Sequence, residues 1–129
     1  MRVWYTAYKP LGTDVYVYYR ILSSSDTSTL DSQNWQPMVQ ISQLNSYSTN
    51  RTNLIEYEFA PGIPSANTNV TGYYSGAANN NIQYTSTNGS TYTNFIQFQI
   101  KLVMVAQDPT QVPFLSDVRA IALPSGTYI

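Results

Sequence analysis

The sequence predicts an all-β domain, built as an antiparallel two-sheet β-sandwich of jelly-roll type, and three observations lead to this prediction. Several segments alternate between apolar and polar residues, as half-buried strands do. These segments are short and are separated by turns rich in Pro and Gly. No segment shows the period of an amphipathic helix. The chain has 129 residues, which is enough for one domain, so we assign residues 1–129 to a single unit.

The first predicted strands lie in the N-terminal third of the chain. Residues 2–8 alternate weakly and are rich in aromatic side chains, and Lys9-Pro-Leu-Gly-Thr13 follows as a turn. Residues 14–22 are almost wholly β-branched or aromatic, which is typical of a central strand. A polar loop and the segment around Trp35 then lead to a short strand near residues 37–41.

The middle of the chain contains one clear strand and one unusual segment. Residues 53–59 alternate, with Ile55, Tyr57 and Phe59 on one face. Residues 61–93 are a long polar loop excursion dominated by Asn, Thr, Ser, Gly and Tyr. A loop of roughly 30 residues is uncommon inside a compact domain and is usually functional or disordered. We expect at most one irregular hairpin within it.

The last third has the clearest pattern. Residues 94–106 and 114–123 read as two strands joined by a Pro-bounded turn, and we expect them to form a β-hairpin within one sheet. In the first of them, apolar side chains alternate with Gln and Lys. The predicted core comprises Val15, Val17, Ile55, Tyr57, Ile96, Phe98, Ile100, Leu102, Val118 and Ile121.

Composition excludes several classes of function. Charged residues make up 10% of the chain, against about 25% in an average soluble domain, and the net charge is -1. No basic patch is visible, so we expect no binding to nucleic acid. No apolar run approaches the roughly 18 residues of a membrane span, and no basic-then-apolar leader opens the chain, so we expect no membrane insertion and no secretion signal. The chain lacks Cys and His, which excludes disulfides and the usual zinc sites.

The acidic residues are the remaining candidates for chemistry. Glu56 and Glu58 share a strand face about 7 Å apart, but nothing indicates the groove that a catalytic carboxylic acid needs, so we expect no enzyme. Asp14, Asp26 and Asp31 offer oxygen ligands of the kind calcium prefers. Carboxylates that cap turns are commoner, so we expect no metal and no cofactor.

Tyrosine is the best sign of function. The chain has 12 tyrosines and 2 tryptophans, and such side chains combine a large rigid contact area with a polar tip. Tyrosines within strands are explained by strand propensity. The candidate contacts to a partner or a glycan are therefore Trp35, Tyr73, Tyr74, Tyr84 and Tyr92, mostly from the polar excursion.

Three parts of the chain share a recognisable pattern. They are Thr13-Asp-Val-Tyr-Val-Tyr-Tyr-Arg-Ile-Leu22 with Trp35-Gln-Pro-Met38; Tyr57-Glu-Phe59; and Phe95-Ile-Gln-Phe-Gln-Ile-Lys-Leu-Val-Met104 with Val112-Pro113 and Leu115-Ser-Asp-Val-Arg-Ala-Ile-Ala-Leu123. Together they resemble a β-sandwich domain of tail and baseplate proteins in contractile-tailed phages of the cyanophage type. The likeness spans most of the chain outside the excursion, and Arg20 stands where the family pattern has Lys.

This resemblance implies a structural, non-enzymatic component of a virion tail or baseplate, such as the baseplate wedge. Its partners would be other virion proteins in a multi-subunit assembly, after synthesis in the host cytoplasm. The final strands also resemble those of discoidin or galactose-binding-like sandwiches. That likeness implies an alternative function, a carbohydrate-binding adhesion module that recognises a host-surface glycan.

Overall fold

A computed structural model describes residues 1–61 and 83–122 of the chain. The all-β prediction is confirmed for these residues, whose only helical element is a single 3-10 turn, η1. No helix among them is long and apolar enough to cross a membrane. The elements are β1 (Arg2–Tyr8), β2 (Thr13–Leu22), η1 (Leu30–Ser32), β3 (Gln36–Gln40), β4 (Ile55–Pro61), β5 (Tyr84–Thr85), β6 (Thr91–Tyr92), β7 (Gln97–Ala106) and β8 (Phe114–Ile121).

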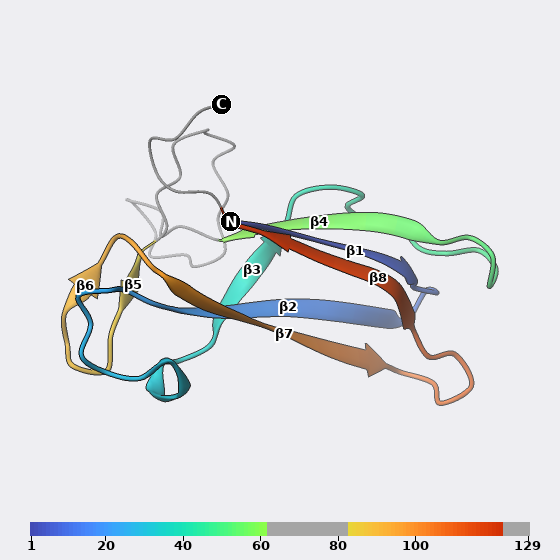
Figure 1. The fold of residues 1–129 in the computed structure, drawn as a ribbon. Helices are drawn as coiled ribbons and strands as arrows, with labels where there is room; N and C mark the ends of the chain where they lie inside the picture. The colour runs from blue at the N-terminus through green and yellow to red at the C-terminus, as the bar shows by residue number, and fades with distance from the viewer. Residues whose placement is uncertain (62–82, 123–129) are drawn as a thin grey trace, which may run out of the picture.

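Six strands form one curled antiparallel sheet in the order β7-β2-β3-β4-β1-β8, and β5 and β6 form a small second sheet (Figure 1). The expected sandwich of two separate sheets is therefore not confirmed, and a jelly roll is not shown. The reason lies in β3, which pairs with β2 through Gln36 and Pro37 and with β4 through residues 38–40. A strand that changes partners along its length joins the two halves into a single sheet.

The turn between β1 and β2 depends on a glycine. Gly12 has φ of 89°, a backbone conformation that residues with a Cβ rarely adopt. The N–H of Thr13 donates to the carbonyl oxygen of Pro10 over 3.1 Å and closes the turn. The turn delivers β2 to a position between β3 and β7, where its apolar residues face the inside of the curl.

The core lies inside the curl and is filled from β1, β2 and β4. Tyr5 is fully buried against Tyr57, with ring centroids 5.3 Å apart, and its hydroxyl donates to the Val15 carbonyl over 3.0 Å. The Tyr57 hydroxyl donates to the Ser46 carbonyl over 2.7 Å. Buried phenols need such partners, because an unpaired polar group costs about 1–3 kcal/mol. The buried cluster is Val3, Tyr5, Ala7, Val15, Val17, Tyr19, Ile21, Met38, Tyr57, Phe59 and Tyr84.

The predicted hairpin of the last two strands is wrong. β7 pairs with β2 along its whole length, and β8 pairs with β1, so the two strands occupy opposite edges of the six-stranded sheet. Residues 107–113 cross from one edge to the other (Figure 1). Each of the two strands pairs over most of its length with a strand that is distant in sequence, β2 for β7 and β1 for β8. The order of strands along the chain does not reveal this pairing.

The predicted core is correct only in part. Val15, Val17 and Tyr57 are buried, and Ile55, Ile100 and Leu102 are half-buried. Four others, all on or beside the edge strands, are exposed: Ile96 68%, Phe98 40%, Val118 44% and Ile121 49%. Phe98 and Val118 are on edge strands, which have only one neighbouring strand to cover their side chains. Ile121 is opposite Arg2 and therefore lies on the face of the sheet away from the core.

Part of the excursion is described, from residue 83 onward. β5 and β6 form the irregular hairpin that we expected there, with Tyr84 opposite Tyr92. The N–H of Ser86 donates to the Ser90 carbonyl over 2.8 Å across the turn. Tyr73 and Tyr74, two of the candidate contact residues, lie outside the described residues.

Candidate functional site

The candidate tyrosines Tyr84 and Tyr92 lie together, with ring centroids 5.6 Å apart. Tyr84 is only 7% exposed. Its hydroxyl donates to Asp26 Oδ2 over 2.8 Å and accepts from the N–H of Ser23 over 2.7 Å. Tyr92 is half-buried, and its hydroxyl accepts from the Asn88 amide over 3.1 Å. Tyr84 therefore connects the small hairpin to the loop after β2 through these hydrogen bonds, and little of its side chain is accessible to a partner.

Asp26 is the electrostatic centre of this cluster. It is buried, and its carboxylate accepts hydrogen bonds from the Tyr84 hydroxyl, the N–H of Ser28 at 2.8 Å and the Asn88 amide at 3.3 Å. Burial alone would raise the pKa of Asp26, but hydrogen bonds, first among them that from Ser86, outweigh it and lower the pKa to about 2. Burial, together with the neighbouring carboxylate, raises the pKa of Tyr84 to about 12.

The possible metal ligands do not converge. Asp26 organises the loop after β2 through its hydrogen bonds to Ser28 and Asn88, as turn-capping carboxylates do. Asp14 pairs with Lys9, and Asp31 pairs with Arg20. Within residues 1–61 and 83–122, no group of three or more acidic side chains could hold a metal ion.

Trp35 belongs to a separate cluster on β2 and β7. The Arg20 guanidinium lies 4.3 Å and the Lys101 ammonium 4.7 Å from the centroid of its ring. Arg20 also donates to Gln99 Oε1 over 2.6 Å and pairs with Asp31 at 3.4 Å. Cations held over an aromatic ring interact with its π-electrons and occupy the surface on which a sugar would stack. No ring contact in the described part of the chain joins Trp35 to Tyr84 or Tyr92.

The two glutamates of β4 form ion pairs. Glu58 lies 3.9 Å from Arg2, and Glu56 forms a hydrogen-bonded ion pair with Arg119. Arg119 also pairs with Asp117 at 3.3 Å, as the shared strand face predicted. These charges are on the face of β1, β4 and β8 that points away from the core, where ion pairs lie in water and contribute little.

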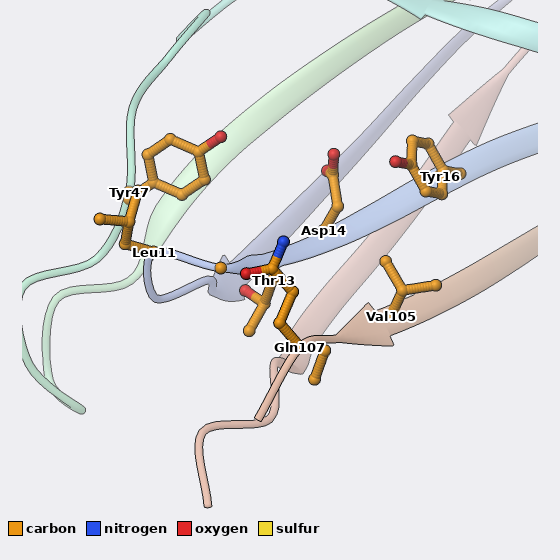
Figure 2. Close-up of a pocket in the computed structure, with 9 residues that line it drawn as sticks. Leu11, Thr13, Asp14, Tyr16, Tyr47, Val105 and Gln107 are labelled. Atoms are coloured by element: carbon orange, nitrogen blue, oxygen red, sulfur yellow. The ribbon is translucent and has the colours of Figure 1, made fainter. Parts of the chain in front are cut away.

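A half-open pocket of about 450 Å³ lies where the β1–β2 turn meets the end of β7 (Figure 2). Its polar lining residues are Thr13, Asp14, Tyr16, Tyr47 and Gln107. Asp14 Oδ1 is 3.3 Å from the ammonium of Lys9, a side chain buried over the ring of Tyr57 at 4.5 Å. The pocket therefore offers one carboxylate that is already neutralised, and it holds no nucleophile paired with a base.

The most distinctive surface follows β7, the connection 107–113 and β8, and we call it the β7–β8 face. Most large hydrophobic side chains that are exposed in the described residues belong to it, whereas Leu11, Tyr16, Leu44 and Leu54 are scattered over turns and β2. Its members are Ile96, Phe98, Met104, Val105, Val112, Phe114, Val118 and Ile121.

Several of these side chains point toward the core and are still exposed. Directly opposite residues of an antiparallel pair share one face of the sheet. Phe98 is opposite Ile21 and Met104 is opposite Val15, and both partners are buried. On the other edge, Val118 is opposite the buried Tyr5. Within residues 1–61 and 83–122, the side of the core between β7 and β8 is therefore open.

The alternation of the sequence identified β7 and β8 and their apolar face, but it predicted burial where the structure shows exposure. A strand face that is covered in the folded chain and one that stays exposed have the same sequence pattern, because both have apolar residues at every second position. No family model, curated protein or solved structure matches the chain.

Proposed function

We propose that the chain is a non-enzymatic structural module that binds other proteins through the inward-pointing residues of the β7–β8 face. One observation carries this proposal: Phe98, Met104 and Val118 point toward the core and remain 40%, 53% and 44% exposed. Apolar side chains that gather on the surface of a soluble protein often mark a site that binds a partner. The low charge of the chain supports this, since interface cores are depleted in charged residues.

The resemblance described above suggests where such binding takes place. We propose that the partners are neighbouring proteins in the tail or baseplate of a phage virion, within a multi-subunit assembly. In this proposal the core inside the curled sheet is closed only when a neighbour covers the inward-pointing residues of the β7–β8 face. Phe98 and Val118 would then be buried, as the sequence pattern predicts.

The carbohydrate-binding alternative has less support from the geometry. Trp35 carries Arg20 and Lys101 over its ring, and Tyr84 is buried with both hydrogen-bonding directions of its hydroxyl in use. A stacking platform needs open aromatic faces.

Mass spectrometry of gradient-purified virions, with dissociated tails analysed separately, tests the proposed location. We expect peptides of this chain in the tail fraction at a stoichiometric level. Absence from particles, with the protein free in the lysate, would refute the location in the virion.

A pair of variants tests the contact surface. Met104→Lys places a charge on the inward side of β7, and Val105→Lys places the same charge on the outward side of the same strand at a similar exposure, 53% against 42%. We expect Met104→Lys to reduce incorporation into particles much more than Val105→Lys. Equal incorporation of the two would refute the contact role of the inward side of β7.

A further inference from the structure

We infer that the gap between the outer edges of β7 and β8, which pair with no other strand of the described residues and which we call the open seam, binds a pair of antiparallel strands from a neighbouring protein. This inference rests on the proposed function and specifies the partner as a β-hairpin with uncharged, alternating strands. Four features of the described residues support it: strand direction, free backbone groups, the chemistry of the lining and the closed end of the seam.

Strand direction restricts the number of inserted strands that can pair antiparallel with both edges. Every neighbouring pair in the order β7-β2-β3-β4-β1-β8 is antiparallel, so the two edge strands run in opposite directions. A single inserted strand would be antiparallel to one edge and parallel to the other. Two inserted antiparallel strands would be antiparallel to both edges and would complete an all-antiparallel ring. The resulting eight strands enclose an interior that side chains can fill.

Free backbone groups are available along β7. The N–H of Gln107 donates to the Gly12 carbonyl, just beyond the pairing of Thr13 with Ala106. Hydrogen-bonded pairs alternate along an antiparallel ladder, so the odd-numbered residues of β7 bond to β2. The even-numbered residues direct their N–H and C=O groups to the free edge. They are Phe98, Ile100, Leu102, Met104 and Ala106.

The lining determines the chemistry of the occupant. The inward-facing residues of β7 are apolar, as are Val118 and Ala120 of β8, whereas Lys101, Asp117 and Arg119 are on the outward face. Natural proteins protect exposed edges with charges, prolines or bulges. β7 has no proline, and its one charge, Lys101, is on the outward face. β8 has a bulge where it passes Thr6 and Ala7, and its charges Asp117 and Arg119 are on the outward face. An occupant therefore needs apolar side chains on the face that it turns toward the core. A charged side chain on that face would find no opposite charge among the inward-facing residues of β7 and β8.

The seam is closed at one end. Residues 107–113 join the end of β7 to the start of β8 and cross the gap there (Figure 1). The strand pair must enter from the other end, where β7 begins at Gln97 and β8 ends at Ile121. A two-fold dimer that paired β7 with the β7 of a second copy would leave the outer edge and inward face of β8 uncovered.

A synthetic hairpin tests the inference on the full chain. The probe has two strands of about eight residues that alternate Val and Thr and are joined by Asn-Gly, which favours a tight hairpin turn. It is added at up to about 1 mM, and hydrogen exchange is followed residue by residue. We expect exchange to slow about tenfold both at the even-numbered amides of β7 and at those amides of β8 that do not bond to β1. Met104→Lys should abolish this protection, and Val105→Lys should preserve it.

Three results would overturn the inference: protection of only one edge, protection that grows with chain concentration in the absence of the probe, and no protection at any probe concentration. The first would indicate addition of a single strand, and the second a contact between copies. If the probe gives no protection while Met104→Lys still blocks incorporation into particles, the hairpin fails and the proposed function stands. If Met104→Lys and Val105→Lys are incorporated equally, the contact surface of the proposed function fails instead.

Discussion

Truncating the two cross-strand partners Ile21 and Phe98 measures how open the core is in the isolated chain. The two residues are directly opposite on β2 and β7 and face the same core, but Ile21 is 1% exposed and Phe98 is 40% exposed. Ile21→Ala leaves a cavity in a fully packed site and should cost about 3–4 kcal/mol. A fully buried Phe→Ala change costs about 3–5 kcal/mol, and the burial of roughly 60% of Phe98 reduces this to about 2 kcal/mol.

Urea unfolding followed by tryptophan fluorescence gives both free energies of unfolding. We expect Ile21→Ala to be clearly the more destabilising, although Phe98 has the larger side chain. If Phe98→Ala cost as much as Ile21→Ala or more, Phe98 would be fully buried in the isolated chain. The open seam, and the reasoning built on it, would then be refuted.

Three further predictions concern other parts of the molecule. Burial raises the pKa of Tyr19, Tyr57 and Tyr84 from 10.0 to about 12, so these tyrosines lose their protons at a lower pH in the unfolded chain than in the folded one. The free energy of unfolding should therefore be unchanged below about pH 10 and fall as the pH rises toward about 12. A urea midpoint that stays constant from about pH 10 to 12 would contradict this prediction. Gly12→Ala should lower the free energy of unfolding by about 1 kcal/mol, because Gly12 has a φ of 89° that residues with a Cβ rarely adopt. The added Cβ would cause no steric clash, since its nearest atom would lie 3.6 Å away. An unchanged urea midpoint would show that the turn can relax. A glycan array should show no binding, and millimolar binding that is lost on Trp35→Ala would restore the carbohydrate-binding alternative.

Much of the local structure was predictable. Aromatic and β-branched residues marked β1 and β2, and alternation in β4 placed Tyr57 inside and Glu56 outside, as the structure shows. These features depend on neighbours along the chain, which a single sequence displays. The pairing of Asp117 with Arg119 was predictable for the same reason, because residues two apart in a strand share a face.

The candidate contacts were less predictable. Tyr84 was expected in a polar loop at a contact surface, but it is buried against Asp26, a residue 58 positions away. Trp35 was expected to be an open aromatic face, but Arg20 and Lys101 lie over its ring. Both outcomes depend on contacts between distant segments, and the composition of a loop carries no information about them.

The sequence by itself determined that this chain is all-β, where its long strands lie and which side chains share a face, since all three follow from alternation along the backbone. Only the tertiary structure decided that β7 and β8 separate to opposite edges of one curled sheet. The physical reason is that strand pairing is a long-range choice made through backbone hydrogen bonds, which are nearly the same for every residue type. That choice leaves Phe98, Met104 and Val118 facing an open core, which makes the β7–β8 face the surface on which we expect this protein to act.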